Sequence, residues 1–450
     1  MTERRTHSNQ HFMLIILQVL FTSDDSGQLW NSCVWDFSTG TGLMQYRGGS
    51  SGAHSLSLLG NDYLIGGGGQ KSVVNVWELQ RKDQNQIKII LPGKVNCLCP
   101  SPDGNYCIVG IAEKIYIWQT SSGNLLKVIS RHYLDVTCIR FTDDGSHFIT
   151  AGDDNLVIAW CLPRTISSTD FPLSKPEPKY VWTGHSLPVK DVYVGSGGVR
   201  SRVISSSLDQ TCKLWDMTTG ELLCTFIFDD PIMSVYMDSA EFRIFAGSNT
   251  GHIYCVNLYG AKLQKERHIT NKSDDEGISI YKGHSSKINC LSMSMDGSIL
   301  ASGSADCTVK LWDVYSGQCI RTLDHKGSVT NAFITSTPSN ILNPDSKPFL
   351  VVQHFKRHLH STQQQLEGDN SNQTDLIHMK IRGCKRKSER TSNTDINNLI
   401  QSNVSVVNQS DVDVIEAHEE LNKLKSKISK LKNVNKELYD YAVTNIVNKV

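Results

Sequence analysis

The chain has 450 residues, of which 39% are hydrophobic, and its 45 basic and 45 acidic side chains give a formal net charge of zero. This length exceeds one ordinary domain, and the apolar fraction suits a large core but is below that of a membrane protein. A neutral chain has no overall electrostatic attraction to nucleic acid or anionic lipid, although local charged patches remain compatible with it.

The N-terminus carries an apolar run over residues 12–21 that follows Arg4 and Arg5 and resembles the core of a signal peptide. The run is shorter than the ~20 residues of a membrane-spanning helix. Thr22 and polar residues follow it, where a signal peptide has a small-x-small cleavage site. We therefore predict a β-strand over residues 17–23 and a disordered extension over residues 1–16.

Seven segments share one ending, apolar-x-apolar-Trp-Asp or a close variant. The tryptophan position is occupied by Trp35, Trp77, Trp118, Trp160, Trp215, Val256 and Trp312, at spacings of 42, 41, 42, 55, 41 and 56 residues. A period near 40 with this ending is typical of WD40 blades, four-stranded sheets that stack radially to bury their faces. The sequence thus predicts an all-β fold, a seven-bladed WD40 β-propeller over residues 17–355.

The two ends of this region are expected to close the ring together. Only two strands, residues 17–23 and 29–36, fit before the end of the first segment, whereas a blade needs four. Residues 319–323 and 328–335 supply two further strand patterns after Trp312. Pairing them with the N-terminal strands would complete one blade and remove its open edges.

Three repeats carry polar residues at matching offsets from tryptophan, except that a two-residue insertion around residues 195–198 shifts His185 from offset 28 to offset 30. The sets are His132, Thr150, Asp154 and Trp160; His185, Ser205, Asp209 and Trp215; and His284, Ser302, Asp306 and Trp312. An imidazole, hydroxyl, carboxylate and indole can form one buried hydrogen-bond chain. The same residue types occur in hydrolase triads, but because the set recurs once per blade and always ends in tryptophan, we interpret it as structural. The other repeats, which have Leu29, Lys71, Ala112 and Thr250 at the aspartate offset, are expected to lack it.

Other motifs give no support for catalysis or cofactor binding. Residues 66–72 resemble a phosphate-binding loop, but Gln70 replaces the required glycine and a strand follows, which indicates a turn. The chain has no metalloprotease, paired C-x-x-C or nucleophile-elbow motif, so we expect no enzyme, no cofactor and no metal site. Thirteen cysteines lack a disulfide framework, which favours a reducing compartment. The insertions at residues 165–180 and 263–278 are expected to be surface loops, either partner contacts or tolerated insertions.

The C-terminal quarter has a different composition. Residues 356–395 are polar and predict a disordered linker, in which Lys385, Arg386 and Lys387 suggest a nuclear localisation signal, an RNA-contacting patch or a solubilising segment. Residues 396–450 predict a helical coiled-coil tail. Its core positions are Val414, Leu421, Leu424, Ile428, Leu431, Asn435 and Leu438. Asn435 on a core position favours a parallel homodimer; packing on the propeller or on another protein's helix is the alternative.

Several longer strings resemble one family. They are residues 77–84, 122–126, 130–133, 206–211, 329–332 and 435–441, and the likeness runs from about Val19 to the end of the tail. In these strings the chain resembles the WD repeat-containing protein 18 family, the WD-repeat subunit of the rixosome, a complex that matures the large ribosomal subunit. Residues before Leu17 and the polar linker do not share the likeness.

The resemblance implies a non-catalytic scaffold of the nucleus, nucleolus and nucleoplasm that supports pre-rRNA processing. Implied partners are the proline-, glutamate- and leucine-rich helical-repeat protein, testis-expressed protein 10, the midasin ATPase and pre-ribosomes. The resemblance also implies roles in DNA replication or cytoplasmic dynein-arm assembly. It implies no membrane partner. The rival hypothesis is a propeller adaptor that presents peptides or phosphopeptides to a ubiquitin ligase, for which we would expect arginines around the channel mouth.

Overall fold

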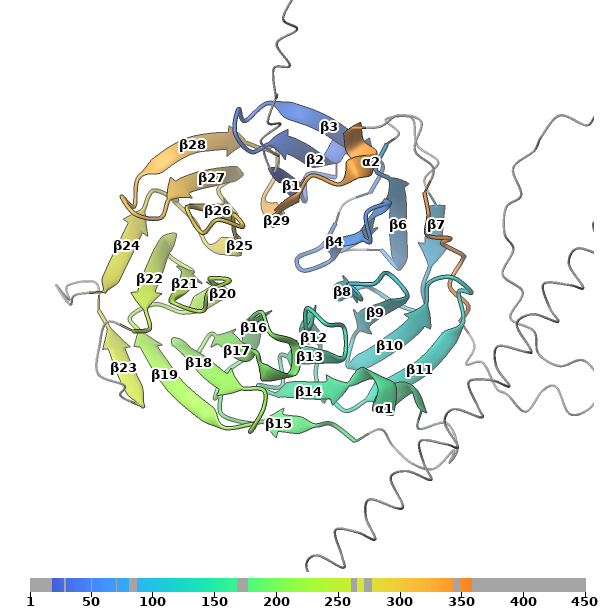
Figure 1. Cartoon of the computed structure of the whole chain (residues 1–450), viewed down its shortest axis with the longest axis horizontal. Helices are drawn as coiled ribbons and strands as arrows, with labels where there is room; N and C mark the ends of the chain where they lie inside the picture. The colour runs from blue at the N-terminus through green and yellow to red at the C-terminus, as the bar shows by residue number, and fades with distance from the viewer. Residues whose placement is uncertain are drawn as a thin grey trace, which may run out of the picture. The chain divides into compact units, whose positions relative to one another are not determined.

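Each Trp-Asp segment forms the third strand of a sheet, because its alternating apolar residues are buried against the neighbouring sheets on both sides. In the computed structural model, seven such sheets, numbered here as blades 1–7, stand around a central axis (Figure 1). The structure describes residues 18–27, 30–49, 51–69, 71–80, 87–167, 177–259, 265–270, 277–342 and 348–357. The predicted all-β, seven-bladed propeller is therefore confirmed.

The blades follow one another in chain order. Blade 1 is β29 (Val329–Ser336), β1 (Gln18–Asp24), β2 (Trp30–Asp36) and β3 (Gly42–Arg47). Blade 2 is β4 (Leu56–Leu59), β5 (Tyr63–Gly67), β6 (Val73–Glu78) and β7 (Ile87–Ile90), and blade 3 is β8 (Cys97–Pro100), β9 (Tyr106–Ile111), β10 (Lys114–Gln119) and β11 (Leu125–Ser130). Blade 4 is β12 (Val136–Phe141), β13 (His147–Gly152), β14 (Val157–Cys161) and β15 (Tyr180–Trp182).

The second half of the ring repeats this order with one addition. Blade 5 is β16 (Val189–Val194), β17 (Arg202–Ser207), β18 (Thr211–Asp216), β19 (Leu222–Phe228) and the added β23 (Glu266–Ile269). Blade 6 is β20 (Ile232–Met237), β21 (Arg243–Ser248), β22 (His252–Asn257) and β24 (Ile278–Lys282), and blade 7 is β25 (Ile288–Met293), β26 (Ile299–Ser304), β27 (Thr308–Asp313) and β28 (Cys319–Asp324). Short helices α1 (Leu162–Ser167), η1 (Gly198–Arg200) and α2 (Ser339–Leu342) lie in connections.

Blade 1 joins the two ends of the propeller. β1 pairs antiparallel with β29 from Gln18 opposite Ser336 to Asp24 opposite Val329, and Phe21 stacks on Phe333 with ring centroids 5.1 Å apart. The predicted closure by both ends is found, but the predicted division of the blade into two strands from each end was wrong. One strand comes from the C-terminal end and three come from the N-terminal end. β28 pairs with β27 and completes blade 7, while β3, which follows Trp35, supplies the outer strand of blade 1. The reason is that tryptophan lies on the third strand, so a fourth strand follows each signature.

The insertion at residues 263–278 is more than a surface loop. Its described part includes β23, which pairs in parallel with β19 of the preceding blade, from Thr225 opposite Glu266 to Phe228 opposite Ile269. β23 therefore covers the outer edge of blade 5 and protects that edge from pairing with other chains. The insertion at residues 165–180 begins within α1 and ends at β15, and residues 168–176 are outside the described part.

The second strands of the blades are the most deeply buried part of the ring; every residue of β5, β13 and five of the six residues of β9 are buried. These strands are buried because they lie between the inner and third strands of each blade, with neighbouring sheets on both faces. In the described ranges no helix is long and apolar enough to cross a membrane. The predicted extension, residues 1–16, and the predicted linker and tail beyond residue 357 lie outside the described residues, so their boundaries stay predictions.

Candidate functional site: hydrogen-bond networks, strap and pocket

The three histidine sets form continuous hydrogen-bond chains in blades 4, 5 and 7. In blade 4 the His132 ring contacts the Asp154 carboxylate through Nδ1 at 2.9 Å and the Thr150 hydroxyl through Nε2 at 2.9 Å. Trp160 donates its indole N–H to the same hydroxyl at 3.1 Å. His185, Ser205, Asp209 and Trp215 repeat this geometry in blade 5, and His284, Ser302, Asp306 and Trp312 repeat it in blade 7.

This geometry assigns a role to each group. The carboxylate can only accept, so the imidazole donates from Nδ1 and accepts at Nε2 the hydrogen bond that the hydroxyl donates. The hydroxyls of Thr150, Ser205 and Ser302 belong to residues with no exposed surface. Because each hydroxyl already serves both the indole and the imidazole and is shielded from solvent, none is available as a nucleophile.

The aspartates also hold a turn. Asp154 Oδ2 accepts the Tyr133 backbone N–H at 3.0 Å, and Asp306 Oδ2 accepts the Ser285 backbone N–H at 3.1 Å. Burial on its own would raise the pKa of Asp306, but hydrogen bonds from Thr308 and His284 outweigh it and lower this pKa to about 2. The pKa values of Asp154 and Asp209 are lowered as well, since hydrogen bonds from His132 and His185 oppose the effect of burial. Each carboxylate is therefore ionised and ties the incoming loop to its blade.

Blade 1 contains a related set that the sequence offsets missed. Trp35 donates its indole N–H to Thr22 Oγ1 at 2.8 Å, and His325 Nδ1 lies 3.8 Å from Asp24 Oδ2. The set is incomplete, because the buried His325 Nε2 has no hydrogen-bond partner and so does not reach the Thr22 hydroxyl. Thr22 lies two residues after Leu20, the partner of Trp35, as Thr150 lies two residues after Phe148, the partner of Trp160.

Counting offsets back from the tryptophan missed the hydroxyl and the histidine of blade 1 for two reasons. The connection between β1 and β2 is longer than its counterpart in blade 4, so the hydroxyl is 13 residues before tryptophan in blade 1 and 10 residues before it in blade 4. The histidine comes from the other end of the propeller, just before β29. Counting from the strand register, with the closing strand included, would have located both groups.

The indoles of blades 2 and 3 use backbone carbonyls instead. Trp77 donates to the carbonyl of Arg47 at 2.9 Å, and Trp118 donates to the carbonyl of Lys356 at 2.9 Å. The second contact comes from residues 348–357, here called the strap, which returns to the rim after blade 1 has closed (Figure 1). A segment remote in sequence therefore completes blade 3, and a local repeat pattern contains no sign of it.

The strap is attached at both of its ends. At its start the Asp62 carboxylate accepts the backbone N–H groups of Phe349 and Leu350, each at 2.7 Å. At its end Lys356 donates its N–H to the Gly123 carbonyl at 2.7 Å, and the Phe355 ring stacks on Trp118 with centroids 5.2 Å apart. Phe355 is 5% exposed whereas Phe349 is 91% exposed. Lys356, which we predicted as the first residue of the linker, is thus bonded to blade 3.

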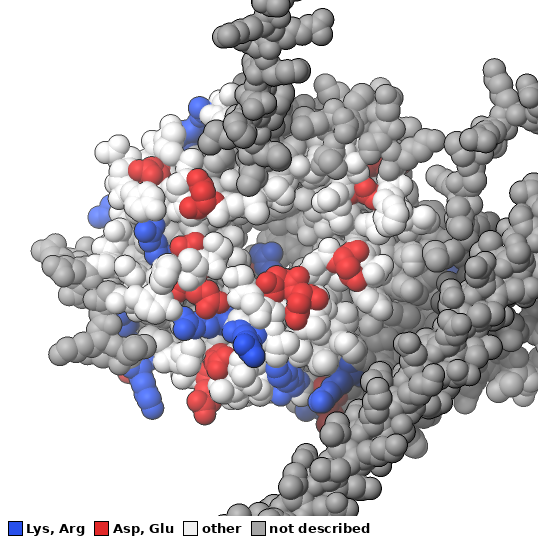
Figure 2. Space-filling model, viewed as in Figure 1, with Lys and Arg blue, Asp and Glu red and all other residues white. Residues whose placement is uncertain are grey.

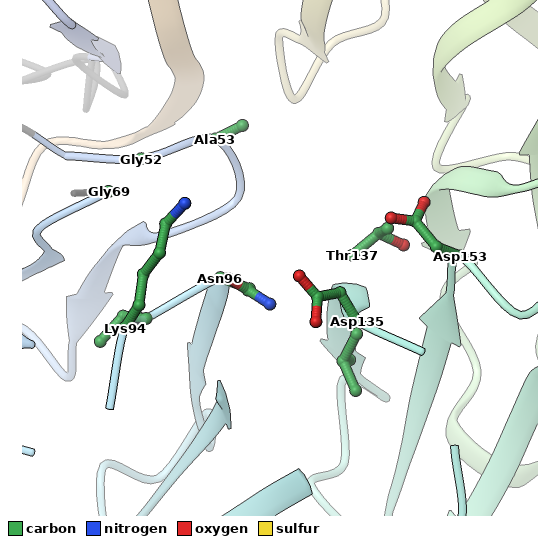
Figure 3. A pocket seen from close by; sticks show the side chains of 10 residues that line it. Gly52, Ala53, Gly69, Lys94, Asn96, Asp135, Thr137 and Asp153 are labelled. Atoms are coloured by element: carbon green, nitrogen blue, oxygen red, sulfur yellow. The ribbon is translucent and has the colours of Figure 1, made fainter. Parts of the chain in front are cut away.

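A polar pocket of about 240 Å³ lies where blades 2, 3 and 4 meet (Figure 3). Lys94 lies on one wall, and Asp135 and Asp153 lie on the opposite one. Asp153 accepts a hydrogen bond from Lys190 Nζ at 2.8 Å. The ten lining residues include one lysine, two aspartates and no arginine. A pocket for a phosphate group needs converging cationic or backbone donors, so this lining does not suit a phosphopeptide.

Charged side chains are interspersed over the described part of the face in Figure 2, with both signs present across it. This distribution is unlike the single-sign stripe of a nucleic-acid footprint. Lys385, Arg386 and Lys387, and the core positions Val414, Leu421, Leu424, Ile428, Leu431, Asn435 and Leu438, lie outside the described residues. The localisation and coiled-coil hypotheses therefore stay predictions.

Comparison with known proteins gives matches over the repeats and over nearly the whole chain. The family model "WD domain, G-beta repeat" matches residues 123–161, 176–216 and 276–313, each match ending one residue after the tryptophan of a complete network. WD repeat-containing protein 18 of Danio rerio is 41% identical over 427 residues, covering 95% of this chain and 97% of the relative. The Homo sapiens protein of the same name is 46% identical over 343 residues, covering 76% and 78%.

More distant relatives extend the comparison. Pre-rRNA-processing protein pro-1 of Caenorhabditis briggsae is 28% identical over 353 residues, covering 76% of this chain and 65% of that protein. The alignments with this protein and with the Danio rerio relative both span most of the chain. The similarity is therefore not confined to the short endings that unrelated propellers share.

Proposed function

Because the chain belongs to the WD repeat-containing protein 18 family, we propose that it is a non-catalytic scaffold subunit of a ribosome-biogenesis complex. Its role there is to support pre-rRNA processing and maturation of the large ribosomal subunit. The observation that carries the proposal is the alignment with the Danio rerio relative over 95% of the chain, together with the more distant match to a pre-rRNA-processing protein.

The geometry of the ring supports a scaffold over an enzyme. The three sets that could be mistaken for hydrolase triads have their hydroxyls buried at 0% exposure and bonded to an indole N–H. A triad serine must instead face a substrate carbonyl and an oxyanion hole. The strap bonds to Asp62 of blade 2 and to Trp118 of blade 3, so the chain is anchored at the rim where the predicted linker begins.

We propose that the partners are those of the family: the proline-, glutamate- and leucine-rich helical-repeat protein, testis-expressed protein 10, the midasin ATPase and pre-ribosomes. The tail is proposed to form a parallel homodimer, and the site of action is proposed to be the nucleus, with the nucleolus and nucleoplasm. Direct contact with RNA has no support from the interspersed charges in Figure 2. The pocket in Figure 3 contains no arginine, so it gives no support to the ubiquitin-ligase adaptor hypothesis.

The test combines affinity purification with analysis of pre-rRNA. Cells depleted of the endogenous protein receive the tagged full chain or a version ending at residue 409, and purified partners are identified by mass spectrometry. We expect the full chain to recover pre-ribosome factors and to restore spacer processing on RNA blots. Recovery of ubiquitin-ligase subunits in place of pre-ribosome factors would refute the proposal.

Two variants test catalysis by the propeller and dimerisation by the tail separately. Ser302→Ala removes the nucleophile that a hydrolase would need, and under the scaffold proposal this variant restores processing as long as the protein remains folded. Processing lost in a folded Ser302→Ala protein would favour catalysis. Self-association unchanged after removal of residues 410–450 would disprove the coiled-coil dimer alone and leave the scaffold role intact.

A further inference from the structure

Three side chains with metal-binding atoms converge at the centre of the ring. His54 lies in the connection before β4 of blade 2, Cys138 lies on β12 of blade 4, and Asp191 lies on β16 of blade 5. Blades 2 and 4 are not neighbours, so these residues meet across the ring axis. His54 Nδ1 is 3.6 Å from Asp191 Oδ1, Cys138 Sγ is 3.4 Å from the same oxygen, and the three atoms all lie within 4.8 Å of one another.

Two of these separations, those from Asp191 Oδ1 to His54 and to Cys138, match the edges of a zinc coordination tetrahedron. Bond lengths of about 2.0 Å to nitrogen and oxygen and about 2.3 Å to sulfur place tetrahedral ligand atoms roughly 3.3–3.6 Å apart. The two distances to Asp191 Oδ1 agree with this range within a few tenths of an ångström. Since the three atoms lie within 4.8 Å of one another, a metal ion would fit after the His54 and Cys138 side chains adjust around Asp191.

The surroundings hold the groups in place as outer-shell partners do in metal sites. Asp191 is 2% exposed, its Oδ1 accepts the Val192 N–H at 2.9 Å, and its Oδ2 accepts the Val235 N–H at 3.1 Å. His54 has a φ of 52°, which is uncommon for a residue with a side chain and needs support from its surroundings. The carboxylate is thus fixed by two backbone bonds, and the imidazole is held beside it.

Metal binding by this set requires the Cys138 thiol to release its proton, because the thiolate is the form of cysteine that binds metal. Arg140 Nη2 lies 3.9 Å from Asp191 Oδ1; it balances the carboxylate charge in the metal-free protein and lowers affinity for a cation.

We propose that His54, Cys138 and Asp191 bind one Zn²⁺ ion at the centre of the ring, with a fourth coordination position left to water. Nitrogen, sulfur and oxygen ligands in a three-plus-water set are those that zinc accepts at open sites. Ala53 and Thr137, which precede His54 and Cys138 in the sequence, line the polar pocket of Figure 3. The sequence predicted no metal because the ligands come from three blades and form no short-spaced motif.

The test uses Co²⁺ as a spectroscopic probe with the reduced full-length chain. We expect one equivalent of Co²⁺ to produce a thiolate-to-cobalt charge-transfer band and the intense visible bands of tetrahedral cobalt, and Zn²⁺ to abolish both. Absence of a charge-transfer band at saturating Co²⁺ would overturn the proposal.

Matched variants assign the ligands. Cys138→Ser should remove the charge-transfer band, whereas Cys319→Ser, at an exposed thiol, should leave it intact. His54→Asn suits the positive φ and should weaken Co²⁺ binding by at least about tenfold. Tryptophan fluorescence confirms that each variant is folded. A band that survives in folded Cys138→Ser, or that is lost in Cys319→Ser, would place the metal elsewhere and refute the site.

Discussion

Replacing Thr150 by valine removes the central hydroxyl of the blade 4 network while keeping the shape of the side chain. The substitution leaves the Trp160 indole N–H and the His132 Nε2 atom buried without their shared partner. Each buried unsatisfied group costs about 1–3 kcal/mol, so Thr150→Val should lower the free energy of unfolding by about 2–6 kcal/mol. Because Thr150 has no exposed surface, water cannot replace the hydroxyl.

Thr150→Ser is the matched control, since it keeps the hydroxyl and loses one buried methyl group, at a cost of about 1 kcal/mol. Urea unfolding followed by tryptophan fluorescence measures both variants against the unmodified chain. We expect valine to destabilise the protein clearly more than serine does. Equal losses for the two variants, or a loss below about 1 kcal/mol for valine, would show that the hydrogen-bond chain contributes little and would refute this reasoning.

Three further predictions concern the strap, acid stability and ring closure. Phe355→Ala removes the ring stacked on Trp118 and should speed hydrogen exchange and protease cleavage in residues 348–357, whereas Phe349→Ala, at a 91% exposed position, should change neither; equal effects would contradict the anchoring role. The pKa of Asp306 is about 2 in the folded protein and about 3.9 in the unfolded chain. Its ionised carboxylate therefore stabilises the fold fully above a pH of about 3.9, and this stabilisation is lost as the pH falls through about 2. Asp306→Asn should therefore flatten the stability profile between these pH values, and an unchanged profile would exclude this carboxylate as a source of acid sensitivity. Phe21→Ala should cost about 3–5 kcal/mol in urea unfolding, because Phe21 is fully buried and stacked on Phe333 across the closure; a cost below about 1 kcal/mol would indicate that the closing strands contribute little.

The features predictable from sequence are those set by short-range pattern. The seven related endings, six of them with tryptophan, recur because each blade buries its third strand in the same environment, so their spacing predicted the number of blades. The hydroxyl lies ten residues before the tryptophan in blades 4, 5 and 7 because the turns between their second and third strands have the same length. His185 lies 30 residues before its tryptophan, whereas His132 and His284 lie 28 before theirs. Outside these offsets, Trp118 bonds to Lys356 from the far end of the propeller. Trp35 and Trp77 bond instead to Thr22 and Arg47.

The features that escaped prediction depend on contacts between distant parts of the chain. Lys356 reaches Trp118 across 238 residues, and β23 pairs with a strand of the preceding blade. His54 and Asp191 meet only because the ring brings blades 2 and 5 toward one axis. None of these contacts produces a repeating pattern in the sequence. Each occurs once, and the sequence does not indicate which distant residue is the partner.

The pairing of β1 with β29 has a consequence for synthesis on the ribosome. The bond between Ser23 and Thr330 spans 307 residues, so β1 emerges long before its inner neighbour exists. At translation rates of about 5–20 residues per second, roughly 15–60 s pass before β29 is made. Throughout that interval the nascent chain presents an unpaired β1 edge, which makes blade 1 the place where a cotranslational chaperone would be needed.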